Sequence, residues 1–362
     1  MGRILKHLKY PVRYPGIIPR AAENYFRMMV LGQKRLRAVE FAVNYVCQCQ
    51  CAHCSVEFLG QKRRPLLDTA QVSRVLDELH DMGVMNINFT GGEAILRPDL
   101  RELVRAARPK STVVSVATAA TMVDAKIADD LRDWGVRIVT ISLDSADAET
   151  HDRSRRHPGS YDKVMNATRL FQERDIDVFW CTILTDENAI NGDMLRLVDQ
   201  AEEWGVTLTI NFSCPVGAWH EQPVGVAPEL KVLHRELMER EHVRWEGHSN
   251  YHKEGCPAGI EKLYISPYGE VMPCPFIHVT FGNVLQRSVK DIWNEMTGTE
   301  PFHEVQEGCP VAENPTFFVQ YLSPLKTAEI HPVSIEQIGV TPSSIKTAPA
   351  LCADGVTETA SA

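Results

Sequence analysis

A regular alternation of short β-rich runs and amphipathic helical patterns extends from residue 38 to about residue 217. Because strand–helix alternation builds parallel sheets through right-handed crossovers, the pattern predicts an α/β fold with a partial (β/α)6 parallel barrel. Functional groups of such barrels lie on loops at the carboxyl ends of the strands. The expected strands are Val39–Val46, Val84–Thr90, Thr112–Thr118, Arg137–Leu143, Val178–Leu184 and Thr207–Phe212. The expected helices are Thr69–Met82, Pro98–Ala107, Asp124–Trp134, Tyr161–Arg174 and Asn191–Trp204.

Charge and hydropathy narrow the possible function classes. The net charge of −9 gives a nucleic-acid role no global electrostatic support. No signal peptide and no apolar run of about 18 residues is present, so the sequence predicts a cytoplasmic protein without a membrane-spanning segment. The ten cysteines of a cytosolic protein are expected to serve metal binding or catalysis rather than disulfides.

Three cysteines directly after the first expected strand form the strongest motif. Cys47, Cys51 and Cys54 could hold three irons of a 4Fe–4S cluster and leave the fourth iron open to chelate a small amino acid. Half of a zinc site is an alternative, because Cys51 and Cys54 have zinc-ligand spacing, and so are buried thiols without a ligand role. Cys49 is interpreted as a bystander thiol, and its exchange with Cys47 as a ligand is the alternative.

Over residues 38–217 the chain resembles the radical S-adenosylmethionine (SAM) superfamily. The run 47–54 matches the family motif Cys-x3-Cys-x-aromatic-Cys, with His53 at the aromatic position. The second expected strand ends in Thr90-Gly-Gly-Glu-Ala94, which is similar to the family's Gly-Gly-Glu-Pro except for the final Ala. The segments 141–144 and 151–155 resemble two later family segments that contact SAM.

The resemblance assigns candidate ligands of SAM. Glu93 would accept the amino group, the segment ending in Asp144 would contact the ribose, and Arg155 would hold the carboxylate, with Arg153 as the second choice. The full set of expected SAM-binding residues is Gly91, Gly92, Glu93, Ser142, Asp144 and Arg155.

The resemblance also implies an activity. A radical SAM enzyme reductively cleaves SAM to a 5′-deoxyadenosyl radical, which abstracts hydrogen from a substrate. The expected cofactors are SAM, the SAM-binding 4Fe–4S cluster and a second, auxiliary iron–sulfur cluster. A reductase such as flavodoxin or ferredoxin is expected to donate the electron.

A second cysteine group begins at Cys256 and continues through Gly269 to Cys274, with Cys309 after a gap. This spacing resembles the opening of the SPASM or twitch extension of radical SAM enzymes. The segment 262–272 between the cysteines is expected to form a hairpin, since its turn carries Pro and Gly. Cys256, Cys274 and Cys309 would hold an auxiliary cluster with an open iron, or a fourth ligand such as Cys214 would complete it, or the module would hold no cluster. A zinc ribbon is less favoured, because its Cys-x2-Cys spacing is missing.

These patterns divide the chain into five parts. They are a basic leader (1–37), the radical SAM core (38–217), a linker helix (218–247), the SPASM/twitch-like module (248–320) and a largely disordered tail (321–362). The leader has nine basic residues against one acidic residue, with interleaved aromatics. It could contact the anionic inner face of a membrane or pack as an arm on the barrel.

The substrate is the least constrained prediction. A small molecule or lipid precursor of a biosynthetic pathway is the first hypothesis, a SPASM-type peptide maturase is the second, and a non-catalytic metal-binding protein is the third. Cys214, at the rim of the expected barrel, is a weak candidate for a catalytic hydrogen donor, and Cys181 is expected to be a core residue.

Overall fold

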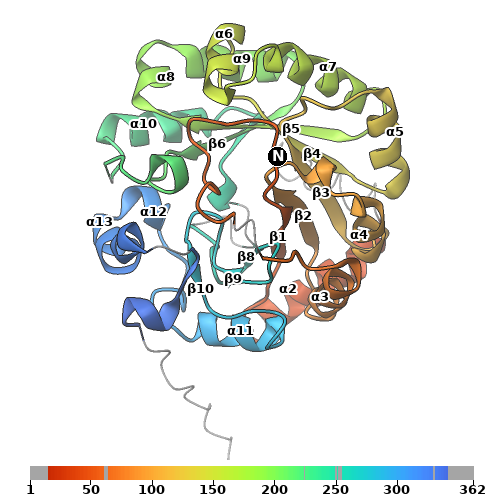
Figure 1. Cartoon of the computed structure of the whole chain (residues 1–362), viewed down its shortest axis with the longest axis vertical. Helices are drawn as coiled ribbons and strands as arrows, with labels where there is room; N and C mark the ends of the chain where they lie inside the picture. The colour runs from red at the N-terminus through yellow and green to blue at the C-terminus, as the bar shows by residue number, and fades with distance from the viewer. Residues whose placement is uncertain are drawn as a thin grey trace, which may run out of the picture.

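The computed structural model describes residues 15–60, 64–223, 225–248, 251, 255–328 and 331–340. One sheet of nine strands organises this part of the chain, in the order β7-β6-β5-β4-β3-β2-β1-β8-β9 (Figure 1). Strands β1 to β6 are all parallel and lie in sequence order, as the strand–helix alternation predicts. Their bounds are β1 (Ala38–Asn44), β2 (Asn86–Gly91), β3 (Val113–Thr118), β4 (Ile138–Ser142), β5 (Asp177–Leu184) and β6 (Thr207–Phe212).

Helices connect these strands and cover the outer face of the curved sheet (Figure 1). Several begin at an aspartate whose side chain accepts a backbone N–H of the first turn, as Asp68, Asp124 and Asp147 do. The helices are α3 (Thr69–Asp81), α4 (Leu100–Ala106), α5 (Ala125–Trp134), α6 (Ala148–Arg155), α7 (Ser160–Gln172), α8 (Asp186–Ile190) and α9 (Asp193–Glu203).

The predicted partial (β/α)6 barrel is therefore confirmed, and every predicted strand and helix of this part is present. The short helices α6 and α8 are additions that hydrophobic periodicity did not indicate. Helix α6 is strongly polar, with the sequence AETHDRSR, so it carries no apolar stripe that a periodicity analysis could detect.

The segment after the barrel extends the same sheet. Strand β8 (Lys262–Ile265) pairs in parallel with β1, and β9 (Val271–Met272) pairs antiparallel with β8, which confirms the predicted hairpin. At the opposite edge, β7 (Val243–Arg244) pairs with β6. Helix α10 (Pro228–Leu237) occupies the predicted linker helix. The auxiliary segment is thus fixed to the barrel by main-chain hydrogen bonds of β1.

The region predicted as a disordered tail is ordered in its first part. Strand β11 (Val333–Ser334) pairs in parallel with β10 (Val279–Thr280), and Tyr321, Leu322 and Ile335 are buried. The boundary at residue 320 was therefore wrong, because these side chains complete the core of the auxiliary segment. Residues 341–362 lie outside the described residues. The other elements are α11 (Val289–Thr297), α12 (Pro310–Glu313), α13 (Pro315–Phe317), the π-helical turn η5 (Phe318–Leu322) and the short 3-10 turns η1 (Pro15–Ile17), η2 (Ala94–Leu96), η3 (Gly217–Trp219), η4 (Glu246–His248), η6 (Ser323–Thr327) and η7 (Ile335–Ile338).

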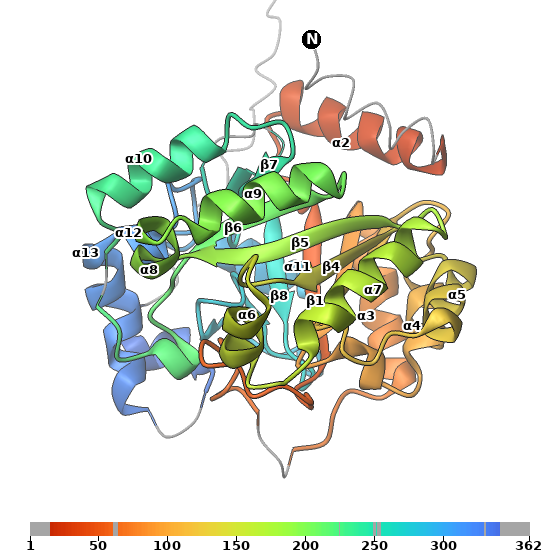
Figure 2. The same ribbon diagram turned by 90° about the horizontal axis from the view of Figure 1, so that it is seen from above.

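The described part of the basic leader contains helix α2 (Ile18–Met29), which crosses one end of the barrel (Figure 2). Its inward contacts are polar: Arg20 donates to the carbonyl of Val84, and Asn24 donates to the carbonyl of Gly83. Its outward face is apolar, with Ile18, Tyr25, Phe26 and Met29 exposed. No helix of the described residues is long and apolar enough to cross a membrane.

Candidate active site

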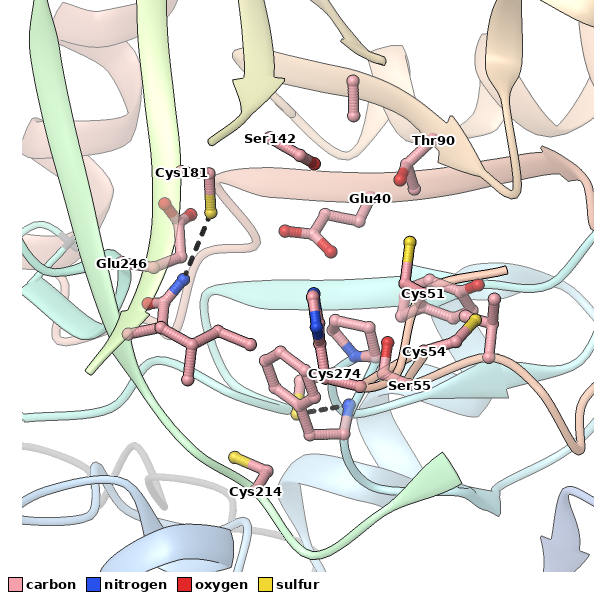
Figure 3. A pocket seen from close by; sticks show the side chains of 18 of the residues that line it. Glu40, Cys51, Cys54, Ser55, Thr90, Ser142, Cys181, Cys214, Glu246 and Cys274 are labelled. Atoms are coloured by element: carbon pink, nitrogen blue, oxygen red, sulfur yellow. Dashed lines mark hydrogen bonds between the residues drawn. The ribbon is translucent and has the colours of Figure 1, made fainter. Parts of the chain in front are cut away.

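A cavity of about 860 Å3 lies at the carboxyl ends of the barrel strands. Residues at or near the ends of β1 to β6 form one side, and the auxiliary segment around Cys256, Cys274 and Cys309 forms the other. Figure 3 shows Cys51 and Cys54 at one end of this cavity and Cys274 and Cys214 at another. Its volume is within the range of about 300–1,000 Å3 that is usual for small-molecule and cofactor sites.

The loop 47–54 lines the cavity directly after β1. Cys47 is exposed, and Cys51 and Cys54 are half-buried. Main-chain hydrogen bonds fix the loop: the Ala52 N–H donates to the carbonyl of Ser154, and the Ala218 N–H donates to the carbonyl of Cys54. The three predicted cluster cysteines are therefore presented toward one cavity by a loop with defined anchors.

Cys49 lies among these cysteines. Its backbone N–H contacts the Cys47 Sγ at 3.4 Å, and its thiol hydrogen-bonds with the thiols of both Cys47 and Cys51. The hydrogen bond between the Cys49 and Cys51 thiols, together with the nearby charge of Arg155, outweighs the effect of burial and lowers the pKa of Cys51 to about 6. A cysteine that ionises readily is suited to bind iron, because the thiolate is the ligand form. Exchange of Cys49 with Cys47 as a ligand stays an open prediction.

A buried ion pair lies next to the cysteine loop. The Arg155 guanidinium donates to Asp144 Oδ1 at 2.5 Å and contacts the Cys51 Sγ at 3.5 Å. Burial alone would raise the pKa of Asp144, but the charges of Arg155 and His53 lower it to about 2. Ser142, Asp144 and Arg155 all line the cavity, whereas Arg153 pairs with Glu149 on the outer surface. Arg155 thus lies where a carboxylate ligand could reach it, and Arg153 does not.

The Gly-Gly-Glu segment has a different arrangement from the one the sequence suggested. Gly91 and Gly92 line the cavity, and a Cβ at Gly92 would lie 2.4 Å from the carbonyl oxygen of Val46, so only glycine fits against the end of β1. Glu93 is 1% exposed. Its carboxylate accepts hydrogen bonds from Thr118 and from the Ala119 N–H, at 3.0 and 2.9 Å.

The placement of Glu93 bears on its predicted role. Burial raises the pKa of this carboxyl, while bonds from the chain's own donors stabilise its charged form. Acceptance of the SAM amino group by Glu93 therefore stays a prediction. In the structure, the Glu93 carboxylate connects the end of β2 to the end of β3 through its hydrogen bonds with Thr118 and Ala119. The glycines lie on the cavity surface itself.

The auxiliary cysteines come from three separate segments. Cys256 precedes β8, Cys274 follows β9, and Cys309 precedes α12, and all three line the cavity. Burial, with the neighbouring Cys309, raises the pKa of Cys256 to about 12. Buried thiolates repel one another unless a positive centre lies between them, so this donor set fits an iron–sulfur cluster.

The described cysteines form no disulfide. Among the same residues, no three His, Cys, Asp or Glu side chains converge closely enough to hold a single metal ion. An iron–sulfur cube carries each iron at a separate corner and therefore spreads its thiolates more widely than one ion does.

A buried charged cluster that the sequence analysis missed also lines the cavity. Lys262 Nζ lies 2.5 Å from Glu40 Oε1 and 2.9 Å from Glu246 Oε1. Burial would raise the pKa of Glu246, but Lys262 and Arg244 lower it to about 2. Glu40 interrupts the apolar run of β1. A charged residue within an otherwise apolar buried strand was the signal from which the sequence could have indicated this cluster.

Cys181 was expected to be a core residue, but it also lines the cavity. The buried residues of β5 alternate, and Cys181 lies on the less buried, inward face, where Asn211 Nδ2 is 3.6 Å from its Sγ (Figure 3). Period-2 alternation in β5 could have identified this face.

Comparison with known proteins agrees with this geometry. The radical SAM superfamily model matches residues 42–201, and the model of an iron–sulfur cluster-binding domain, SPASM, matches residues 256–311. An AdoMet-dependent heme synthase of Methanosarcina barkeri is 25% identical over 288 residues, covering 71% of this chain and 82% of that protein. A PqqA peptide cyclase of Xanthomonas euvesicatoria is 27% identical over 299 residues, covering 76% and 80%.

The fold has solved counterparts. The crystal structure of Streptococcus suis SuiB bound to the precursor peptide SuiA matches with a TM-score of 0.61 at 15% identity, covering 79% of this chain and 70% of that chain. Two domain models in the expected order and relatives that are named enzymes exclude the hypothesis of a non-catalytic metal-binding protein. The chain belongs to the radical SAM superfamily: it is an enzyme with a C-terminal SPASM extension, and its cofactors are S-adenosylmethionine and iron–sulfur clusters.

Proposed function

We propose that this enzyme modifies a peptide by radical chemistry. The observation that carries the proposal is the similarity to a PqqA peptide cyclase over 76% of the chain, which extends beyond the radical SAM core. The fold shared with SuiB, which was crystallised with a precursor peptide, is compatible with the same substrate class. A peptide thereby takes precedence over the small molecule or lipid precursor that is the first hypothesis from the sequence.

The lining of the cavity combines polar and apolar side chains, as a peptide substrate would require. Glu40, Glu246 and Lys262 all contribute to its surface, together with uncharged polar groups such as Ser142 and Asn211. These three charges compensate one another, and apolar side chains such as Phe276 and Ile277 also line the cavity. Peptide amides and polar side chains could supply hydrogen bonds to the polar groups.

The roles of the chain's own residues follow from their positions. Cys47, Cys51 and Cys54 would hold the SAM-binding cluster, which when bound and reduced supplies the electron that cleaves SAM to methionine and a 5′-deoxyadenosyl radical. Gly91 and Gly92 would let SAM approach the backbone closely. Arg155, fixed by Asp144, would orient the SAM carboxylate. A reductase such as flavodoxin or ferredoxin would donate the electron.

A small-molecule substrate is the second candidate, because an AdoMet-dependent heme synthase is 25% identical over 71% of the chain. The two candidates predict different responses in one assay. Anaerobically reconstituted enzyme is incubated with SAM, a reductant and either peptides encoded by genes adjacent to its own or porphyrins.

The proposal expects a peptide to increase 5′-deoxyadenosine formation and to change in mass. The matched control is the variant in which all three cysteines of the SAM-binding cluster are alanine. Stimulation and modification restricted to the porphyrins would reject the peptide proposal in favour of the small-molecule one.

We also propose a peripheral membrane contact through the leader. Helix α2 presents Ile18, Phe26 and Met29 outward while polar bonds fix its inner face. Each basic residue close to an anionic surface contributes about 1 kcal/mol, so a few of the leader's nine could give reversible docking.

Liposome sedimentation tests this contact. The intact protein should sediment with anionic vesicles at low salt and be released at high salt, and the double variant Phe26→Ser/Met29→Ser should sediment less. Ile190→Ser is the control, since Ile190 is 86% exposed on α8, away from the leader. Equal sedimentation of the double variant and the wild type would assign the leader to a packed arm.

A further inference from the structure

Cys214 lies two residues beyond the end of β6, at the same edge of the sheet as the other cavity residues. It is 7% exposed, and its Sγ is 3.7 Å from the carbonyl oxygen of Phe212. Figure 3 shows its thiol on the side of the cavity where Cys274 lies, away from Cys51 and Cys54. Its position therefore associates it with the auxiliary cysteines rather than with the SAM-cluster loop.

The contacts of the Cys214 thiol are with these cysteines. It hydrogen-bonds with the thiol of Cys309, and Cys214, Cys256, Cys274 and Cys309 all line the same cavity. Four thiols, of which Cys214 is buried and the other three are half-buried, thus come from four segments of the chain: the end of β6, the start of the hairpin, the end of the hairpin and the start of α12. The SPASM-matching segment contributes three of the four.

Four thiolates are the complete ligand set of a 4Fe–4S cluster. With three thiolates, one iron stays open to an external ligand, whereas four close the cluster. We propose that Cys214 is the fourth thiolate ligand of the auxiliary cluster, together with Cys256, Cys274 and Cys309. The auxiliary cluster then has no open iron, and it cross-links the barrel strand β6 to the C-terminal module.

This assignment decides between the two roles that the sequence left open for Cys214, a hydrogen donor and a fourth cluster ligand. A thiol that donates hydrogen to a product radical must keep its proton and face the substrate, but a ligand thiol is ionised and bound to iron. Contact with Cys309 favours the ligand role. The assignment is independent of the substrate, because it concerns only the cofactor that the SPASM segment binds.

Spectroscopy of the auxiliary cluster alone tests the proposal. The variant with Cys47, Cys51 and Cys54 all replaced by Ala removes the SAM-binding cluster, so its remaining iron reports only the auxiliary site. In this background we expect about four irons per chain and an electron paramagnetic resonance spectrum that does not change when cyanide is added, because no iron is open. A cyanide-dependent change with Cys214 intact would overturn the proposal, whether or not any further variant folds.

Substitution of Cys214 in the same background provides the second measurement. Cys214→Ser should alter the spectrum, make it responsive to cyanide or lower the iron content from about four to about three per chain. Cys181→Ser is the matched control, since Cys181 lines the same cavity without contacting the auxiliary cysteines in any described interaction, and it should leave iron content and spectrum unchanged. A Cys214→Ser spectrum identical to that of its background would also overturn the assignment. No substrate is used, so failure here is distinct from failure of the peptide proposal.

Discussion

Replacing Lys262 with Met should destabilise the fold in a pH-dependent way. The ammonium lies between Glu40 and Glu246, and its side chain is only 8% exposed. Removing one partner of a buried ion pair costs about 3–5 kcal/mol. Glu246 keeps Arg244 at 2.6 Å, so the loss should lie near the lower limit, at about 3 kcal/mol. With a urea dependence of about 3 kcal/mol/M, the midpoint of unfolding falls by about 1 M.

The pH dependence of this loss has a definite sign. In the wild type, the pKa of Glu246 is about 2, below its ordinary 4.5, so its contribution to stability is present above pH 4.5 and disappears as the pH falls through 2. Lys262, whose pKa is raised, contributes below its ordinary 10.5 and loses that contribution only at higher pH. Without the ammonium, the pKa of Glu246 rises. The difference between variant and wild type should therefore be largest near neutral pH and shrink on acidification, as protonation removes the unpaired charge.

Urea unfolding of the reconstituted protein at about pH 7 and about pH 5 measures both effects. Lys126→Met is the control, because Lys126 pairs with Asp130 on the surface and its removal should leave the midpoint unchanged. Adding Glu40→Gln to Lys262→Met should restore part of the loss, since it removes an unpaired carboxylate. An unchanged midpoint for Lys262→Met, or an equal loss at both pH values, would refute this account of the cluster.

Three further predictions concern the SAM site. Replacing the three cysteines of the SAM-binding cluster with Ala should abolish 5′-deoxyadenosine formation in a reductive assay; full activity would reject the ligand assignment. Arg155→Lys should weaken SAM binding about 10–100-fold in equilibrium dialysis, because a hydrogen bond to a charged group contributes about 1.5–3 kcal/mol, and unchanged affinity would exclude this contact. Gly92→Ala should lower the free energy of unfolding by about 1–3 kcal/mol, because the new Cβ would meet the Val46 carbonyl. Gly298→Ala is the control and should not lower it, because the nearest atom to its Cβ would be 3.4 Å away. Equal stability of the two variants would contradict the close approach at Gly92.

The sequence predicted the barrel well because its signals are local. Apolar runs, amphipathic stripes and helix-ending glycines each arise within a few residues, so they identify a strand or helix without knowledge of its neighbours. The tail up to residue 340 was missed for the opposite reason. Strand β11 has only two residues, and its partner β10 lies far away in the sequence, so no periodic pattern could mark it.

The residues of the candidate site likewise fall into those that the sequence could predict and those that it could not. Cys47, Cys51 and Cys54 share one loop, so their spacing is a readable motif. Glu40, Lys262 and Glu246 come from three different elements, and their proximity depends on the pairing of β8 with β1. A sequence can show that Glu40 interrupts an apolar run, but it cannot show which cation compensates it.

Pairing of β8 with β1 has a consequence for the arrangement of the two cysteine groups. Strand β1 leads directly into the loop that contains Cys47, and β8 lies between Cys256 and Cys274. Since the two strands are hydrogen-bonded in a fixed register from Ala38–Lys262 to Phe41–Ile265, the sheet sets the separation of the two groups. A ligand at Cys214 would add a second constraint from β6, on the other side of the cavity. The auxiliary cysteines can therefore be widely spaced in sequence and still keep a constant position relative to the SAM-binding loop. Because of this wide spacing, their motif is harder to recognise in the sequence than that of Cys47, Cys51 and Cys54.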